Sequence, residues 1–433
     1  MTDSGTPQIA AFIGIDWADE KHRWALQVAG PPGPRTPVEQ GEVAHTPEAL
    51  EAWICALGAR YPGRSLAIAL EQSRGALLFA LSKYAHVVLY PIHPNTLDHY
   101  RKSFYPSGAK SDPGDAALIL ELLVKHPERL RRFQPDTVET RTLQFLVEAR
   151  REAVDEKTRC LNRLTSQLKM YFPQLLDWFE VDQVLLSELL LEWPTLEHWR
   201  QARPSAVAKW LRQRHLSQPR VAQLQADLAA ALPATHDAAV IEAGVLTAQR
   251  VARQLQLLRD SIAQLDRRLA ELTQAHPDRA IFQSLPGAGP VMVPRLIAAF
   301  GTQRERYATA AQMQCYAGIA PVTERSGKHT WVHWRWACPK FLRQTFHEWA
   351  WLSTRTSAWA RAFYQRQREK GKSHHAAVRA LAFKWLRVVF RCWKDAKPYD
   401  QTRYSQALQK RAKPVEIPVK KTSGLTSIKD LLA

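Results

Sequence analysis

Residues 9–16 read IAAFIGID and residues 110–125 read KSDPGDAALILELLVK, and these two stretches decide the fold class of the first part of the chain. The first is an apolar run of strand length that ends in Asp16. The second carries a strongly apolar helix pattern that begins at Asp112 and runs to Lys125. A buried strand and a buried helix, both beginning or ending with an acid, indicate an α/β unit.

The segments between these two stretches alternate between strand and helix patterns. Strand candidates are His22–Ala29, a short segment near Gly41–Ala44, Leu66–Leu70 and His86–Tyr90. Helix candidates are Glu48–Leu57, with Thr46 as N-cap and Pro47 at the first helical position, and Gly75–Tyr84. Three strands followed by alternating helices and strands predict an α/β domain with a mixed sheet, residues 1–132.

The charge of the chain is concentrated in its last third. The 433 residues hold 60 Lys and Arg against 41 Asp and Glu, a formal charge of +19. Residues 1–132 hold 14 of each sign and residues 133–280 hold 19 of each, whereas residues 281–433 hold 27 basic and 8 acidic residues. This distribution is typical of a polyanion binder, not of an ordinary metabolic enzyme. We therefore expect the C-terminal third to bind nucleic acid.

Secreted and membrane-spanning classes are disfavoured. The five cysteines are scattered without a C-x-x-C pair, which argues against a zinc ribbon and a disulfide framework. The first residues, MTDSGTPQIA, lack a basic region followed by a long apolar run. No stretch of about 18 consecutive apolar residues occurs. These features predict an intracellular protein without a membrane partner.

The middle of the chain, residues 133–280, has the pattern of long helices. Thr137–Tyr171 contains no proline, and Val245–Leu272 has apolar residues at alternating steps of four and three. The latter are Val251, Leu255, Leu258, Ile262, Leu265, Leu269 and Leu272. The two helices are predicted to pair as an antiparallel or intersubunit coiled coil, or to form a plain helical-bundle core. Between the two long helices, we expect residues Phe172–Thr235 to form a helical insertion, to which the sequence assigns no role.

Four carboxylates of the first part are candidate metal ligands. We call Asp16, Glu71, Asp112 and Asp115 the acid set. Asp16 and Glu71 each end a predicted strand, and the other two lie at i and i+3 on one helix face. Four converging carboxylates need a cation, and oxygen ligands suit Mg²⁺ or Mn²⁺, which can assist phosphoryl transfer. Each residue alone also fits a turn, a cap or a surface position.

A glycine-containing turn opens the basic third. Residues 284–302 read SLPGAGPVMVPRLIAAFGT, in which Gly287 and Gly289 can bring backbone N–H groups close to a phosphate at the start of a helix. This pattern is similar to a helix-hairpin-helix motif, which contacts the DNA backbone without reading its sequence. The alternative is a simple turn between two helices.

Ser326 is a candidate nucleophile. It precedes Gly327 and lies between Arg325 and Lys328, so that its hydroxyl could approach a phosphate whose oxygens are held by cations. The alternative is an ordinary turn or cap residue, which spacing alone favours.

The residues after Ser326 are rich in tryptophan and cations. If they form a strand, one face carries Val332, Trp334 and Trp336, and the other carries Trp331, His333 and Arg335. An aromatic side chain beside cations suits base stacking and phosphate contact, although core packing is the commoner role of tryptophan.

Several ordered motifs resemble the DEDD transposases of the insertion-sequence family one-ten, which includes the Piv-type invertases and the bridge-RNA-guided recombinases. They are IGIDWA, ALEQS, KSDPGDA, LPGAGP, YAGIAPV and RSGKH, and they cover nearly the whole chain. The resemblance implies an RNase H-like (RuvC-like) first domain whose acid set binds divalent metal. It also implies a mainly helical C-terminal transposase domain in which Ser326 attacks the DNA phosphodiester.

The resemblance further implies a DNA transposase that forms dimers or tetramers through its helical middle and is guided by a structured RNA. Its expected location is the prokaryotic cytoplasm, at the nucleoid. The expected domains are 1–132, 133–280, a serine-bearing basic domain at 281–396, and a polar basic tail at 397–433. Two other functions stay open: a RuvC-like junction nuclease that uses the acid set alone, and a noncatalytic nucleic-acid scaffold.

Overall fold

The computed structural model describes residues 8–30, 37–71, 75–104, 112–404 and 406, with Phe104, Asp112 and Pro113 described by their backbones alone. The chain divides into two compact units, residues 1–135 and 136–433. The finer division of the second unit into 133–280, 281–396 and 397–433 stays a prediction. Among the described residues, no helix is long and apolar enough to cross a membrane.

The first unit is built on a mixed five-stranded sheet, as the sequence predicts. Its strands are β1 (Ile9–Asp16), β2 (Lys21–Val28), β3 (Val38–Ala44), β4 (Ser65–Leu70) and β5 (Val87–Pro91). They are arranged in the order β3-β2-β1-β4-β5. The first three strands form an antiparallel meander, and β4 and β5 add in parallel to β1. Strand β1 therefore lies at the centre of the sheet, where its end is flanked on both sides.

Helices cover both faces of this sheet. They are α1 (Pro47–Arg60), α2 (Ala76–Leu81), α3 (Pro94–Phe104), α4 (Asp112–Lys125) and the short η1 (Pro127–Arg129). The Thr46 side chain caps α1 by accepting a hydrogen bond from the Ala49 N–H at 3.2 Å. Helices α1 and α2 share one apolar cluster with the sheet, and α3 and α4 share another with the opposite face. The sequence did not predict α3.

Small residues let α4 approach the sheet closely. Gly14 lies between Ala25 on β2 and Ala69 on β4, so three adjacent strands present almost no side chain at this level. A Cβ atom at position 14 would collide with the carbonyl of Ala116 and the backbone nitrogen of Leu120. The close approach fixes the first turns of α4 against the centre of the sheet.

Replacing Gly14 by alanine is expected to destabilise the first unit by about 3 kcal/mol, because the new methyl group can be accommodated only if α4 moves. Chemical denaturation of the two proteins measures the difference. Gly30→Ala is the matched control, since a Cβ there meets nothing within 4 Å. Equal stabilities for both variants would show that α4 does not need the glycine.

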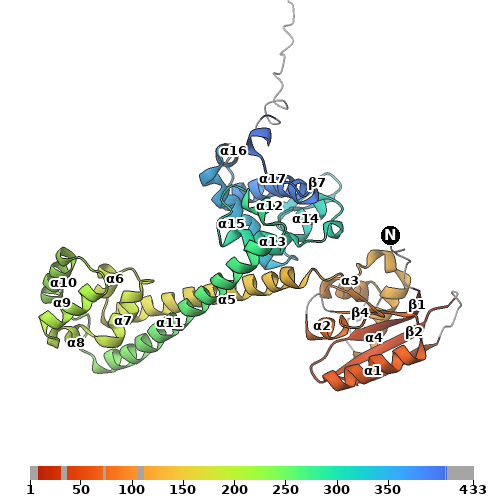
Figure 1. Ribbon diagram of the computed structural model, residues 1–433, viewed down its shortest axis with the longest axis horizontal. Helices are drawn as coiled ribbons and strands as arrows, with labels where there is room; N and C mark the ends of the chain where they lie inside the picture. Colours follow the sequence, from red (N-terminus) through yellow and green to blue (C-terminus); the bar gives the residue numbers. More distant parts are fainter. Residues whose placement is uncertain (1–7, 31–36, 72–74, 105–111, 405, 407–433) are drawn as a thin grey trace, which may run out of the picture. The chain divides into compact units, whose positions relative to one another are not determined.

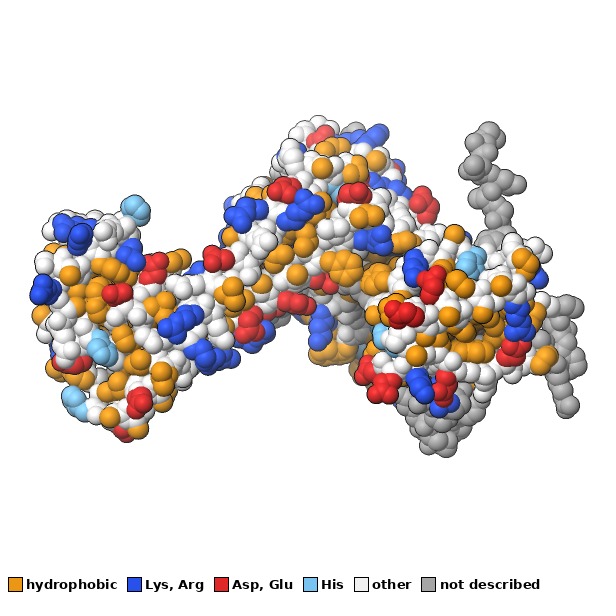
Figure 2. Space-filling model, turned by 60° about the horizontal axis from the view of Figure 1, so that its bottom comes forward, with side chains coloured by type: hydrophobic (Ala, Val, Ile, Leu, Met, Phe, Trp, Pro, Cys, Tyr) orange, Lys and Arg blue, Asp and Glu red, His pale blue; other side chains and the backbone are white. Residues whose placement is uncertain are grey.

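Two long antiparallel helices form the frame of the second unit. Helix α5 (Val138–Tyr171) and helix α11 (Ala238–Ala275) lie side by side (Figure 1). The Arg150 guanidinium joins them through an ion pair with Asp266 at 2.5 Å. The two helices therefore pair within one chain and run antiparallel, which is one of the predicted arrangements. Coiled-coil packing between them stays a prediction. Figure 2 shows basic and acidic side chains interspersed over this helix pair, in line with its balanced charge.

The segment between these helices folds into a small lobe at one end of the pair. It comprises α6 (Gln174–Trp178), α7 (Val184–Glu192), α8 (Leu196–Gln201), α9 (Pro204–Gln213) and α10 (Gln218–Ala230). Its core is continuous with the adjacent turns of the long helices and centres on the buried Trp199, packed against Phe172, Trp178 and Trp193. The predicted helical insertion is therefore a compact element whose apolar core is shared with the ends of α5 and α11.

The other end of the helix pair packs into the C-terminal core. Its elements are α12 (Arg279–Gln283), α13 (Met292–Phe300), η2 (Arg304–Arg306), α14 (Ala310–Tyr316), β6 (Val322–Ser326), β7 (His329–His333), α15 (Lys340–Thr356), α16 (Ala358–Glu369) and α17 (His374–Lys394). Buried aromatic side chains, including Trp349, Trp385 and Trp393, fill the space between the helices. The C-terminal part is mainly helical, as predicted.

The start of the predicted tail belongs to this core. Tyr399 is buried, its hydroxyl accepts a hydrogen bond from Trp359 Nε1 at 2.9 Å, and its backbone N–H donates to Ser284 Oγ at 2.8 Å. Aromatic packing therefore holds the chain to this core as far as Tyr399, and the boundary at residue 397 stays a prediction. Residue 405 and residues 407–433 lie outside the described part.

Candidate functional site

Two members of the acid set end neighbouring parallel strands. Asp16 is the last residue of β1 and Glu71 follows β4, and the preceding pair Ile15 and Leu70 is in register. Adjacent strands lie about 4.8 Å apart, so the two residues are neighbours. Asp16 shares the face of Gly14, which α4 covers. Both acids are half-buried and both engage in polar interactions.

Asp115 lies in the first turns of α4, next to Ala116, whose carbonyl contacts the sheet at Gly14. Its side chain is buried, and Oδ1 accepts hydrogen bonds from Arg101 Nε at 3.1 Å and Nη2 at 2.7 Å. Its other oxygen, Oδ2, is buried and has no hydrogen-bond partner among the residues that the structure describes. A buried carboxylate oxygen without a partner is costly unless a cation or donor meets it.

The acid set therefore fits a divalent cation in part. The free Oδ2 of Asp115 is an oxygen ligand of the kind that Mg²⁺ prefers, and Asp16 belongs to the face that α4 covers. Asp112 begins α4, but its side chain lies outside the described part. Within the part of the chain that the structure describes, no three His, Cys, Asp or Glu side chains form a metal-binding group.

Arg101 is a site residue that the sequence analysis missed. It comes from α3, and its guanidinium is mostly buried against Asp115. The segment that forms α3 is polar, and only the spacing of Leu97 and Tyr100 marks its inner face. The ion pair leaves no local signal in the sequence, because its two partners belong to different helices.

Ser326 lies at the tip of a two-stranded hairpin, residues 322–333, which we call the serine hairpin. Strand β6 ends at Ser326 and β7 begins at His329, with Gly327 and Lys328 as the turn. Gly327 has a φ of +58°, which a tight hairpin turn requires and glycine adopts without strain. Ser326 is exposed, and no described residue forms a hydrogen bond with its hydroxyl.

The register of the serine hairpin decides which predicted residues share the face of the serine. Ser326 pairs with His329, and Glu324 pairs with Trp331, so all four lie on one face. Trp331 is exposed and its ring stacks on that of His329, with centroids 6.0 Å apart. Arg325 and Lys328 are exposed beside the turn. An exposed, cationic tip that carries the Ser326 hydroxyl is therefore present at the end of this unit's only described hairpin.

The predicted alternation beyond His333 is wrong. Strand β7 ends at His333, whose partner is Val322, so Trp334, Arg335 and Trp336 do not continue it. The residue before Val322 is Pro321, which has no N–H to extend the ladder. Arg335 instead donates to the Ala320 carbonyl at 3.4 Å.

Trp334 and Trp336 have different environments. Trp336 is 80% exposed, whereas Trp334 is half-buried, with Arg343 and Arg379 over its ring. The Nε1 of Trp334 is buried and has no hydrogen-bond partner within the described part of the chain. Trp336 thus has a free aromatic surface, and Trp334 has a ring already covered by cations.

His333 is held by the hairpin in a position that favours its protonated form. Its Nε2 lies 2.8 Å from Glu324 Oε1, and this hydrogen bond raises the pKa of His333 above its ordinary value, with a smaller contribution from the Trp334 carbonyl. The stabilisation is present while His333 is protonated and is lost as the pH rises through the raised pKa.

An NMR titration should therefore give His333 a midpoint above 6.5, and Glu324→Gln should lower it. Thr330→Ala, on the opposite face of the same hairpin, is the control and should leave the midpoint unchanged. A wild-type midpoint at or below the ordinary value would contradict the contact.

The two glycines of the predicted phosphate turn differ in structure. Gly287 has a φ of +75°, and a Cβ there would meet the backbone of Leu352 and Ser353 at 2.8 Å, so this glycine allows the turn to pack on α15. Gly289 is exposed, and a Cβ there meets nothing within 4 Å. Helix α13, which follows, is buried along its whole length. Phosphate binding at this turn stays a prediction.

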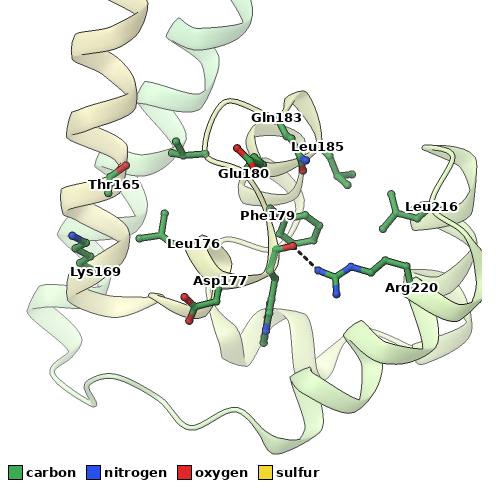
Figure 3. A pocket seen from close by; sticks show the side chains of 12 residues that line it. Thr165, Lys169, Leu176, Asp177, Phe179, Glu180, Gln183, Leu185, Leu216 and Arg220 are labelled. Atoms are coloured by element: carbon green, nitrogen blue, oxygen red, sulfur yellow. Dashed lines mark hydrogen bonds between the residues drawn. The ribbon is translucent and has the colours of Figure 1, made fainter. Parts of the chain in front are cut away.

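A pocket among the described residues lies elsewhere, in the lobe (Figure 3). It has a volume of about 750 Å³ and lies between α5 and the helices around α6. Arg220, which lines this pocket, donates a hydrogen bond to the Trp178 carbonyl at 2.7 Å, and a dashed line marks it in Figure 3. Its lining mixes Lys169 and Arg220 with Asp177 and Glu180, and contains no predicted site residue.

Comparison with protein families finds two matches in this chain. A DEDD transposase model of the IS110 type, described as a transposase, matches residues 13–173. A second model, described as transposase IS116/IS110/IS902 family, matches residues 279–365. The first range contains the whole acid set, and the second contains Ser326 and both glycines of the turn.

Similar proteins are encoded by bacterial insertion elements. The mini-circle putative transposase for IS117 of Streptomyces coelicolor is 26% identical over 408 residues, covering 91% of this chain and 96% of that protein. The IS900 uncharacterized 42 kDa protein of Mycobacterium paratuberculosis is 29% identical over 375 residues, covering 82% of this chain and 90% of that protein. The IS116 uncharacterized 44.8 kDa protein of Streptomyces clavuligerus is 25% identical over 397 residues, covering 89% of this chain and 95% of that protein.

Proposed function

The chain belongs to the IS110 family of transposases and is therefore an enzyme that cleaves and rejoins DNA, and on that premise we propose that it uses the acid set together with Ser326 and is guided by a structured RNA. Two features of the chain, taken together, carry this proposal. A buried carboxylate oxygen of Asp115 has no partner, and the exposed hydroxyl of Ser326 has none among the described residues.

The acid set would hold Mg²⁺ or Mn²⁺. When bound, the metal supplies charge stabilisation to the phosphate oxygens of the scissile DNA. The residues of this chain position that site: β1 and β4 bring Asp16 and Glu71 to neighbouring strand ends, and α4 brings Asp115 to the same face. Arg101 neutralises Asp115 and keeps its carboxylate in a fixed orientation.

Ser326 is the nucleophile in this proposal. Its Oγ forms a bond to the phosphorus of the DNA backbone while the bond from phosphorus to one sugar oxygen breaks, and that oxygen leaves with the electron pair and takes up a proton. The phosphoserine link keeps the phosphodiester bond energy, so attack by a DNA hydroxyl reverses the step and rejoins a strand. Arg325 and Lys328 flank the turn and can hold the non-bridging oxygens.

The nucleic-acid partners are the DNA ends and target, and a structured guide RNA. The excess charge of residues 281–433 supports binding of both, and the exposed Trp331 and Trp336 offer stacking surfaces. In this proposal a dimer or tetramer forms through the helical middle, where Leu246 and Leu257 of α11 are 64% and 69% exposed. The site of action is the nucleoid in a prokaryotic cytoplasm.

A covalent protein–DNA link is the measurement that tests the serine. The protein is incubated with the DNA ends of its element and Mg²⁺, denatured and digested, and the peptides are analysed by mass spectrometry. The peptide that contains Ser326 is expected to carry a nucleotide phosphate. Cleaved DNA without any protein adduct would favour the second candidate, a nuclease in which the acid set activates water.

The guide RNA is tested separately. The protein is purified from cells that carry the DNA flanking its element, and the bound nucleic acid is sequenced. A single discrete RNA from that flank is the expected result. Heterogeneous nucleic acid that is lost at high salt would indicate nonspecific phosphate binding and would remove the guided part of the proposal.

A further inference from the structure

Four basic or titratable side chains of α15 and α17 line one strip of the second unit. They are Arg343 and His347 on α15, and His375 and Arg379 on α17, and we call them the cation strip. Each pair is spaced by four residues, which puts its members on one helix face. The rings of His347 and His375 lie 5.4 Å apart, and the guanidinium carbons of Arg343 and Arg379 lie 5.0 and 3.9 Å from the centre of the Trp334 ring.

No carboxylate of a described residue forms an ion pair with the cation strip. Among the described residues, Arg379 has no hydrogen-bond or ion-pair partner, and Arg343 donates only to the Arg335 carbonyl, at 3.5 Å. Both arginines lie over the same ring, and burial and the nearby charge of Arg343 lower the pKa of Arg379. Elsewhere in this unit, three buried or half-buried arginines pair with acids: Arg295 with Glu348, Arg304 with Asp278, and Arg306 with Asp136.

The start of α17 adds to the positive potential. This helix of 21 residues begins at His374, with no acid in its first turn, and His375 and Arg379 lie in its first two turns. The N-terminal end of a helix carries a partial positive charge. Two like-charged guanidinium groups over one indole, beside a helix N-terminus, form an arrangement that an anion would stabilise.

We propose that Arg343 and Arg379, held over Trp334, bind a phosphodiester group of a nucleic-acid backbone, with His347 and His375 beside it. Guanidinium groups donate paired hydrogen bonds to phosphate oxygens. No described residue accepts a hydrogen bond from Arg379, so its donors are available for such a phosphate. Trp334 is then a platform that orients the two arginines, and it is not a base-stacking residue. The inference rests on the nucleic-acid-binding part of the proposed function and is independent of Ser326.

The test measures binding without cleavage. The full chain carrying Ser326→Ala is titrated against a labelled 20-base-pair DNA and, separately, a 20-nucleotide single-stranded RNA, at several salt concentrations. Adding Arg379→Gln is expected to weaken binding about tenfold and to reduce the slope of log affinity against log salt by about one. Arg387→Gln, which removes an exposed cation from the same helix, is the matched control and should change affinity less than about twofold.

The two probes distinguish the sources of the phosphate. If Arg379→Gln weakens binding of the DNA probe alone, the cation strip binds DNA, and if it weakens binding of the RNA probe alone, the strip binds RNA. Weaker binding of both probes means that the strip accepts either backbone. An Arg379→Gln affinity equal to that of Arg387→Gln for both probes overturns the inference. If the parent protein binds neither probe, the nucleic-acid part of the proposed function fails instead.

Thermal unfolding without nucleic acid separates binding from packing. Removing an uncompensated cation at Arg379 is expected to leave the melting temperature unchanged or to raise it, because Arg343 loses a repulsive neighbour. A lower melting temperature for Arg379→Gln, together with an Arg379→Lys variant that recovers the stability but not the affinity, would show that Arg379 acts in packing. That result would overturn the inference.

Discussion

Ser326→Ala is expected to abolish the covalent protein–DNA link and to reduce strand exchange by at least about 10³-fold, while the affinity for DNA stays unchanged. The reason is that alanine has no atom to bond to phosphorus. Ser326 is exposed at the end of β6, and its hydroxyl makes no hydrogen bond with a described residue, so the loss of that hydroxyl costs the hairpin no side-chain contact. Denaturing gels measure the adduct, and a strand-exchange assay measures product.

Thr330→Ala is the matched control for this variant. Thr330 is an exposed hydroxyl residue of the same hairpin, on the face opposite Ser326, so its loss should change neither adduct nor product. Retained cleavage and strand exchange in Ser326→Ala would assign the chemistry to the acid set alone. Loss of DNA affinity together with activity would mean that the serine acts in binding.

Asp136→Ala is expected to destabilise the second unit by about 3–5 kcal/mol. The Asp136 side chain is almost fully buried and accepts hydrogen bonds from Arg306 Nη2 at 2.6 Å, from the Thr302 N–H at 3.0 Å and from Thr302 Oγ1 at 3.1 Å. Removing it leaves the Arg306 guanidinium and a backbone donor without their acceptor, and leaves a cavity at the start of α5. Urea denaturation measures the loss.

Asp395→Ala is the control for Asp136→Ala. Asp395 pairs with Arg391 at 2.5 Å, but the arginine side chain is 78% exposed, so the pair is screened by water. Its removal should cost less than about 1 kcal/mol. If the two variants lose similar amounts of stability, the network around Asp136 is not the anchor that its burial indicates.

The sheet and half of the candidate site were predictable because they depend on local patterns. The apolar run of β1 ends at Asp16, and the Thr46-Pro47 cap begins α1 where the sequence predicts it. Neighbouring strand ends then bring Asp16 and Glu71 together without any knowledge of side-chain contacts. These features need only the period of a strand, the chemistry of a cap and the rule that parallel strands end at one edge.

The missed features depend on contacts between distant segments. Arg101 reaches Asp115 from a helix whose sequence, PNTLDHYRKSF, is mostly polar. The end of β7 at His333 follows from the partner strand, where Pro321 stops the ladder, and not from the sequence of β7 itself. Trp334 is then captured by Arg343 and Arg379 from two other helices. No periodicity in one segment reports such encounters.

The lobe between α5 and α11 also has a consequence for how this chain can change length. At that end of the pair the two helices touch, since a Cβ at Gly244 would lie 2.6 Å from the Tyr171 ring. A segment whose two attachment points adjoin can be shortened, exchanged or extended without moving the rest of the unit, as in inserted domains generally. Residues 174–278 lie outside both matched family regions. The tip of the helix pair is thus a permissive junction, where a fused reporter or a different module would leave the acid set and the serine hairpin in place.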